Sequence, residues 1–234
     1  MREIVFDTET TGLDNKADRI IEIGCIELDN QFPTGRSLHL FINPAGRKVH
    51  PDALAVHGIT DAFLADKPAF SEVAEEIVAF FDGARYVAHN ANFDMGFLNS
   101  EFQRIDLPAV EPDRVVDTLA LARRRHPMGP NSLDALCRRY GIDNSHRTKH
   151  GALLDAELLT DVYIEMLGGR QAALGLSDVE DANVVETTEH VVVEIGHRPS
   201  PLPERLTVVD LEAHSKLVAR IGENALWLKT PGET

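Results

Sequence analysis

The sequence of 234 residues has little cysteine, no long apolar run and a deficit of positive charge. Cys25 and Cys137 are too few and too far apart for a disulfide framework or a CxxC zinc site, so we expect two reduced, packed cysteines. No apolar run approaches the roughly 20 residues that a membrane-spanning helix needs. The N-terminal stretch MREIVFDTET carries acids where a signal peptide has its apolar segment, and we therefore expect a cytoplasmic protein.

The charge balance is acidic. The chain has 23 Lys and Arg against 38 Asp and Glu, a formal net charge of −15. A protein that binds nucleic acid without sequence preference normally carries a basic surface, so this balance argues against that function. Acidic clusters that hold divalent cations answer part of the objection, because a bound metal ion reverses the local field.

Two kinds of periodicity occur in the first 170 residues. Strands are predicted first, over 3–7, 20–28 and 38–42, and the short polar turns between them favour an antiparallel meander. Short strands then alternate with helices, two of which have a serine, Ser71 or Ser132, as the expected N-cap. The later elements are strands over 86–89 and 115–117 and helices over 71–81, 93–102, 133–137 and 152–167. This order predicts an α/β fold with a mixed sheet.

The sequence changes character after Gly168-Gly169, which are expected to end the last helix of the first domain. The residues that follow are acidic and weakly apolar, as in a linker, and amphipathic character returns near the C-terminus. We therefore predict a domain over 1–170, a linker over 171–190 and a C-terminal segment over 191–234. That segment is too small for a core of its own and is expected to fold against the first domain or against a partner.

Asp7 and Glu9 lie two residues apart at the end of the first predicted strand, so both side chains point to one face. Burial of two neighbouring carboxylates costs free energy through desolvation and mutual repulsion. A shared cation offsets that cost, and oxygen-only ligation suits Mg²⁺ or Mn²⁺ rather than structural zinc. Thr10-Thr11-Gly12 then form a tight turn that a substrate backbone can approach. Acid pairs are common on surfaces, so this pair alone does not establish a metal site.

Two further motifs place polar side chains at the ends of core elements. In HNANFD, one of the two asparagines is expected to cap a helix that has Asp94 in its first turn. In HGALLD, His150 precedes the last helix and Asp155 lies beside its buried stripe. Each motif alone also fits an ordinary helix cap or a surface position.

Together, four carboxylates and one histidine can converge on one site. Two metal ions need about that many anionic ligands, and such a pair clamps the attacking and leaving oxygens of an in-line phosphoryl displacement. A histidine is suited to accept the proton of the attacking water near neutral pH. The five side chains are Asp7, Glu9, Asp94, His150 and Asp155.

The order Asp-x-Glu, HNxxFD and H-x4-D resembles that of the DEDDh family of 3′→5′ exonucleases. FDTETTGL, VHGIT, HNANFD with the following MGFL, and HGALLDAELLTDVY are similar to the proofreading (epsilon) subunits of bacterial DNA polymerase III. The likeness covers residues 2–170. It implies an RNase H-like fold, with a mixed five-stranded sheet flanked by helices and a C-terminal extension. It also implies a metal-dependent DNA exonuclease that releases 5′-mononucleotides from mispaired 3′ ends.

The resemblance implies roles for individual residues. Asp7 bridges two divalent cations, Mg²⁺ or Mn²⁺. Glu9 and Asp155 complete the coordination of the cation on the side of the nucleophile. Asp94 supports the second cation, and His150 is the general base.

Contacts with the terminal nucleotide are also implied by the resemblance. Asp52 stands where close relatives carry a glutamate, and its shorter side chain weakens the transfer of that role. The implied substrate contacts are Asp7, Thr8, Glu9, Thr10, Leu13, Asp52, His57 and Asp155.

Other charged residues near these motifs have two interpretations. The basic clusters at 123–125, 138–139 and 147–149 are either a solvated face or a track for the phosphate backbone. Four neighbouring acids are expected to be surface residues or salt-bridge partners, namely Glu22, Glu27, Glu157 and Asp161.

The C-terminal extension is expected to bind partners. Residues 171–176, QAALGL, resemble a degenerate sliding-clamp-binding peptide, or are simply part of a linker. Residues 211–228, with an isolated Trp227, are similar to the epsilon segment that docks on the polymerase catalytic (alpha) subunit. A small theta-like subunit is a further candidate partner, and no membrane partner is expected. Tethering to a polymerase also reduces the need for a basic surface, because it raises the effective concentration of the DNA end.

Three other functions remain open from the sequence. An RNA-trimming exonuclease of the same superfamily would share the motifs, although it would have no need of a polymerase-docking segment. A non-catalytic scaffold that stabilises a polymerase would share the fold, but it has no need of the five intact site residues. A small-molecule phosphohydrolase would share the chemistry but would bind no DNA end.

Overall fold

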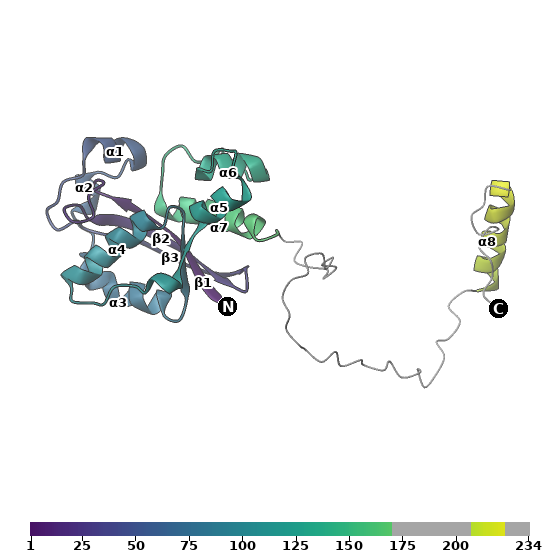
Figure 1. The fold of residues 1–234 in the computed structure, drawn as a ribbon, viewed down its shortest axis with the longest axis horizontal. Helices are drawn as coiled ribbons and strands as arrows, with labels where there is room; N and C mark the ends of the chain where they lie inside the picture. The colour runs from purple at the N-terminus through teal and green to yellow at the C-terminus, as the bar shows by residue number, and fades with distance from the viewer. Residues whose placement is uncertain (170–206, 223–234) are drawn as a thin grey trace, which may run out of the picture. The chain divides into compact units, whose positions relative to one another are not determined.

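A computed structural model describes residues 1–169 and 207–222 of the chain (Figure 1). In the first of these segments, five strands form one sheet in the order β3-β2-β1-β4-β5. The strands are β1 Arg2–Thr10, β2 Ile20–Asp29, β3 Phe32–Phe41, β4 Arg85–Ala88 and β5 Val115–Asp117. Strands β1, β2 and β3 pair in antiparallel fashion, whereas β4 and β5 continue the sheet in parallel with β1. The predicted α/β class and mixed five-stranded sheet are therefore confirmed.

Helices cover both faces of this sheet. Helices α3 and α4 pack on one face, and α5, α6 and α7 pack on the other. The helices of the first segment are α1 Pro51–His57, α2 Asp61–Leu64, α3 Phe70–Phe81, α4 Asn92–Arg104, α5 Thr118–Arg125, α6 Leu133–Tyr140 and α7 Ala152–Met166, with a 3-10 turn at Pro112–Arg114.

Strand β1 contributes to both hydrophobic cores because its side chains alternate between the two faces. Ile4 and Phe6 are fully buried in the core beneath α3 and α4. Val5 is fully buried in the core beneath α6 and α7. Asp7 and Glu9 share the parity of Val5, so the alternation of β1 directs both carboxylates to the α7 side.

Several element boundaries differ from the sequence prediction. Strand β3 begins at Phe32 instead of residue 38, because Asn30 and Gln31, with φ of 50° and 70°, form a two-residue turn that extends the hairpin. Helix α3 begins at Phe70, one residue before the predicted cap Ser71. The Glu72 carboxylate accepts the backbone N–H of the preceding Ala69 at 2.7 Å, which replaces a serine cap.

The start of α4 is also built differently from the prediction. Its N-cap is Ala91, and neither neighbouring asparagine side chain caps the helix. Asn90 has a φ of 63°, and its backbone N–H donates to the Asp117 carboxylate at 3.1 Å. A side chain from the end of β5 therefore stabilises the turn between β4 and α4. The predicted cap of α6 at Ser132 is confirmed, since its hydroxyl accepts the N–H of Ala135.

Helix α8, Val208–Ile221, is the described part of the C-terminal extension and lies within the predicted C-terminal segment, residues 191–234. The Thr207 hydroxyl accepts the N–H of Asp210 at 3.3 Å, and the Asp210 carboxylate accepts the N–H of Thr207 at 2.9 Å. The candidate clamp-binding peptide at 171–176 and Trp227 lie outside the described residues, and the division at 170 and 190 stays a prediction. Within residues 1–169 and 207–222, no helix is long and apolar enough to cross a membrane.

Candidate active site

A cavity of about 380 Å³ opens at the carboxyl ends of β1 and β4. In open α/β sheets this edge is where ligands bind, because loops that leave neighbouring strands diverge there. The residues that line the cavity are Asp7, Thr8, Glu9, Thr10, Gly12, Leu13, Ala53, Val56, His57, His89, Asn90, Phe93, Asp94, Ser132, Leu133, Asp134, Arg147, His150 and Asp155. The structure thus brings all five predicted catalytic residues into one cavity.

Helix α7 approaches this cavity closely because β2 has a glycine opposite Asp7. Gly24 pairs with Asp7 across the antiparallel ladder. A Cβ atom at Gly24 would lie only 2.2 Å from the backbone nitrogen of Leu153, so the first turn of α7 rests directly on the strand. This contact brings Asp155, in the same turn of α7, to the face of the sheet that carries Asp7 and Glu9.

Asp94 reaches the cavity from the opposite helix layer and is oriented by β1. It lies in the first turn of α4 and is 2% exposed. Its Oδ1 atom accepts hydrogen bonds from the Thr8 backbone N–H at 3.1 Å and from the Thr8 hydroxyl at 2.8 Å. Thr8, which lies on β1 between Asp7 and Glu9, therefore orients the carboxylate of Asp94.

The carboxylates at this site repel one another in a buried environment. Burial and the charges of Asp94, Glu9 and Asp155 raise the pKa of Asp7 well above its ordinary value. Burial, followed by the charge of Glu22, raises the pKa of Glu9 to about 8. Burial also raises the pKa of Asp94 to about 7. Raised values show that the side chains alone do not compensate this negative charge, so the donor set fits divalent cations with oxygen ligands.

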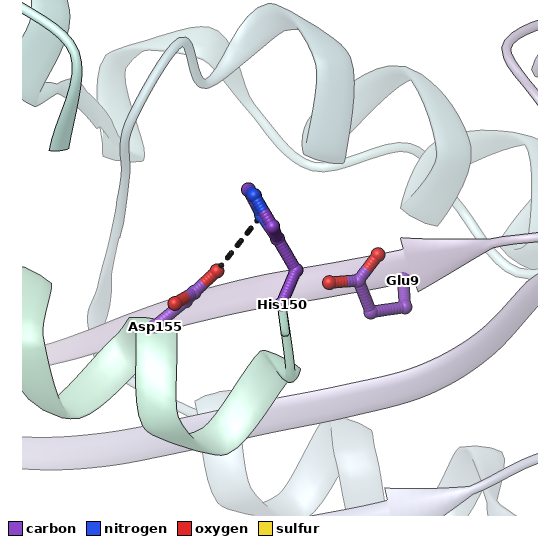
Figure 2. Close-up of side chains that lie close together, drawn as sticks. All are labelled: Glu9, His150 and Asp155. Atoms are coloured by element: carbon purple, nitrogen blue, oxygen red, sulfur yellow. Dashed lines mark ion pairs between the residues drawn. The ribbon is translucent and has the colours of Figure 1, made fainter. Parts of the chain in front are cut away.

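Glu9, His150 and Asp155 lie close enough together to hold one metal ion (Figure 2). One ligand atom from each lies within 4.8 Å of those of the other two, as a shared metal ion would require. The Nδ1 atom of His150 lies 3.3 Å from Oδ2 of Asp155. His150 precedes α7 and is half-exposed, and it is therefore accessible to water and to substrate.

His57 is a buried residue that lines this cavity. Its Nδ1 atom accepts the backbone N–H of Ile59 at 2.9 Å. Burial lowers the pKa of His57, so the ring is neutral and carries its proton on Nε2. The Nε2 atom makes no hydrogen bond of regular geometry among the described residues, although the backbone of Thr10 lies close enough to raise the pKa of the ring. This weakly paired buried donor can turn to a ligand that accepts its hydrogen bond.

The other predicted substrate contacts are divided between two places. Thr8, Thr10 and Leu13 line the same cavity as His57, with Leu13 at the rim and 87% exposed. Asp52 does not line this cavity. Its side chain is exposed beside a neighbouring hollow and lies 3.5 Å from the ring of His50.

The neighbouring acids are surface residues or salt-bridge partners, as expected. Glu22 and Glu27 are buried, and each has a salt-bridge partner. Glu22 lies 2.7 Å from His39, and Glu27 binds Arg2 at 2.5 Å. The two remaining acids, Glu157 and Asp161 on α7, are exposed as expected.

Arg147 is the site residue that the sequence interpretation did not identify. It was expected to belong to a solvated or phosphate-binding basic cluster, yet its side chain is only 8% exposed and contacts Asp155, Asp134 and His150. Only its position in a basic stretch three residues before His150 pointed to this region.

Comparisons with known proteins agree with this geometry. Residues 4–163 match the exonuclease family (RNase_T). An exonuclease X solved in complex with 5′ overhanging duplex DNA is 30% identical, with a TM-score of 0.54, and the match covers 71% of this chain and 90% of that one. The nuclease domain of 3′hExo, a DEDDh family member bound to rAMP, is 16% identical and shares the fold, with a TM-score of 0.61 over 71% of this chain and 91% of that one. The chain belongs to the exonuclease (RNase_T) family.

Curated relatives cover the chain almost from end to end. The DNA polymerase III subunit epsilon of Pasteurella multocida is 43% identical over 99% of this chain and 95% of its own length. The protein of the same name from Escherichia coli is 42% identical over 97% of both chains. The chain is thus a DEDDh-type 3′→5′ exonuclease, and its sequence is similar to proofreading subunits of DNA polymerase III. This family depends on divalent metal ions.

Proposed function

We propose that the chain removes mispaired nucleotides from DNA 3′ ends for a DNA polymerase III, and that Asp7, Glu9, Asp94 and Asp155 hold two Mg²⁺ or Mn²⁺ ions for this reaction. The observation that carries the proposal is the buried, mutually repelling group of carboxylates at one cavity. When bound, the ions would activate water and stabilise the charge that develops on the scissile phosphate. Carboxylate oxygens are the ligands that these hard cations prefer.

His150 is the proposed general base. It is half-exposed at the mouth of the cavity, and one ring nitrogen lies beside Asp155. When Nδ1–H donates a hydrogen bond to that carboxylate, Nε2 carries the lone pair that accepts a proton from water. Asp155 therefore has a second use, because it sets the tautomer in which His150 acts as a base.

Thr8, Thr10, Leu13 and His57 are the proposed contacts with the terminal nucleotide. The Nε2–H group of His57 is directed to an oxygen of the nucleotide, which gives a full hydrogen bond to a buried donor that is only weakly paired within the protein. Leu13 offers an exposed apolar surface at the rim of the cavity, on which a base can stack. Asp52 lies beside the neighbouring hollow, so we assign it at most a contact with nucleotide atoms that extend out of the main cavity.

Selectivity for mispairs follows from the geometry of the substrate. In the proposed reaction a single terminal nucleotide enters the cavity, and a mispaired end separates from its template at a lower free-energy cost than a paired end. We further propose that residues 191–234 dock on the polymerase alpha subunit and that residues 171–176 bind the sliding clamp. A theta-like subunit would bind a surface of the exonuclease domain. Helix α8 supports the first assignment, because its Val208, Val209, Leu211, Leu217 and Ile221 side chains are exposed.

A labelled-primer assay tests the activity. The full chain is incubated with a 5′-labelled DNA primer that is matched or mispaired at its 3′ end, in Mg²⁺ or in EDTA. We expect metal-dependent shortening from the 3′ end, faster on the mispair and lost in Asp7→Asn. Asp161→Asn is the matched control, because Asp161 is exposed on α7 outside the cavity, and it should retain wild-type activity.

An RNA primer of the same sequence separates the alternatives. Shortening of RNA alone would reassign the chain to RNA processing. Shortening of neither primer, in protein that still binds a polymerase alpha subunit, would support the scaffold. Equal rates on matched and mispaired DNA would contradict the proofreading role.

A further inference from the structure

The guanidinium group of Arg147 lies against Asp155, at the position where the proposed metal ion would bind. Its Nε atom donates to Oδ1 of Asp155 at 2.5 Å, and its Nη2 atom donates to Oδ2 at 2.7 Å. Both side chains are more than nine-tenths buried. A guanidinium group paired in this way with a carboxylate forms a planar fork that uses both oxygen atoms. Asp155 therefore has limited capacity to bind a metal ion while this pair persists.

The same guanidinium group also contacts His150. The Nη2 atom lies 2.8 Å from Nδ1 of His150. Arginine donates hydrogen bonds and accepts none, so Nδ1 must act as the acceptor in this contact. A neutral His150 then carries its proton on Nε2 and cannot accept one from water. The arrangement around Arg147 is thus incompatible with the base role proposed for His150.

Asp134 gives Arg147 a second anchor outside the carboxylate cluster. Its Oδ1 atom accepts from Nη1 of Arg147 at 3.0 Å and from the Asn144 side-chain amide at 2.9 Å. The Asp134 side chain is 45% exposed, so it lies toward the mouth of the cavity. An arginine released from Asp155 would retain this partner and would not be left as an unpaired charge.

We propose that Arg147 is an internal counter-cation that holds Asp155 and His150 in an inactive arrangement without metal, and that a divalent cation displaces it toward Asp134. This inference rests on the proposed role of Asp155 as a metal ligand. In the metal-free protein, the guanidinium group offsets part of the repulsion among the carboxylates. When a cation binds, it offsets the repulsion in place of the guanidinium group. Both carboxylate oxygens of Asp155 and Nδ1 of His150 are then released from Arg147. The fold thereby couples metal binding to the assembly of the general base.

Metal binding and melting of the full-length chain test this device without reference to activity. Mn²⁺ affinity is measured by isothermal titration calorimetry, and melting is followed in EDTA and in saturating Mn²⁺. For Arg147→Met we expect Mn²⁺ to bind more tightly by about tenfold or more, the factor that corresponds to one hydrogen bond between charged groups. We expect the melting temperature in EDTA to fall by about 3 °C or more, while that in Mn²⁺ stays within about 1 °C of wild type.

Two variants make the comparison specific. Lys149→Met removes one positive charge from the same loop, where Lys149 lies beside Gly58, and it should change neither quantity in this pattern. Arg147→Lys retains the charge but loses the fork, so it should tighten Mn²⁺ binding by a smaller factor. This variant also keeps the inference testable should Arg147→Met fail to fold.

The outcomes separate the inference from the proposed function. Unchanged affinity in Arg147→Met, with equal losses of melting temperature in EDTA and in Mn²⁺, would show a purely structural residue and overturn the inference. Weaker Mn²⁺ binding would overturn it as well, because Arg147 would then support the loaded site. A wild-type protein that binds no Mn²⁺, or an Asp155→Asn protein that binds it as well as wild type, would instead refute the proposed metal site itself.

Discussion

The contact between Gly24 and helix α7 makes a demanding prediction for Gly24→Ala. The new Cβ atom would lie 2.2 to 2.3 Å from three backbone atoms of Ala152 and Leu153. Ordinary contacts between carbon atoms are about 3.5 to 4.0 Å, so the first turn of α7 must retreat by roughly 1 Å or more. No flexible side chain can absorb this displacement, because the atoms involved belong to the backbone of β2 and of α7.

The displacement should affect both stability and activity. Overpacking of a core typically costs about 1 to 3 kcal/mol, and contact with backbone on both sides favours the upper end, about 3 kcal/mol. Asp155 moves with the helix and away from Asp7 and Glu9. A misplacement of about 1 Å at a reacting centre can lower the rate by roughly 100-fold. We therefore expect a stability loss together with a much larger activity loss than the unfolded fraction explains.

The assays are urea unfolding and single-turnover cleavage of a mispaired primer. Gly96→Ala is the matched control, because Gly96 lies inside α4 and its added Cβ would meet only the amide end of the Asn15 side chain. That control should retain activity and gain up to about 1 kcal/mol from helix propensity. Wild-type stability and rate in Gly24→Ala would refute the argument that this glycine sets the position of Asp155.

Two further predictions concern buried acids. In EDTA, the free energy of unfolding should fall as pH rises from about 5 to 8, because folded Glu9, with its pKa of about 8, keeps a proton that the unfolded chain releases. The difference from the ordinary value of 4.5 corresponds to at most roughly 5 kcal/mol, and Glu9→Gln should remove much of this fall. An identical pH slope in both proteins would contradict the burial argument. Glu101 is 1% exposed and accepts hydrogen bonds from Nε and Nη2 of Arg19 at 2.7 and 2.8 Å. Glu101→Gln should therefore lower the free energy of unfolding, measured in urea, by about 3 kcal/mol. The control Glu157→Gln, on the exposed side of α7, should lower it by almost nothing. A loss below about 1 kcal/mol for Glu101→Gln would show that its contacts with Arg19 are replaceable.

The sequence predicts the fold well because its strands and helices depend on local patterns. Alternating apolar residues define the strands, and helical spacing defines α7, so the mixed sheet follows from the order of the elements. Asp7 and Glu9 share a face through strand parity alone. The meeting of Asp94 with Asp155 requires the fold, and the motif resemblance supplied this expectation before the structure did.

Other features depend on tertiary contacts that no local pattern shows. Gly24 resembles any glycine in a strand, and its importance arises from the backbone of α7 that rests on it. Arg147 lies in a basic stretch that is typical of a solvated surface, whereas the structure buries it against Asp155. The turn before α4 is stabilised by Asp117, which lies 27 residues after Asn90 in the sequence, so the neighbouring asparagines were the wrong candidates.

The central claim is that these carboxylates bind two metal ions around a terminal nucleotide. The most direct measurement is anomalous diffraction from crystals of the full chain grown with Mn²⁺ and a deoxynucleoside 5′-monophosphate. We expect two Mn²⁺ peaks in the cavity, one beside Asp7, Glu9 and Asp155 and the other beside Asp7 and Asp94, with the nucleotide within hydrogen-bond distance of His57 Nε2. Mn²⁺ peaks that lie only outside this cavity, or a nucleotide bound there without metal, would contradict this claim.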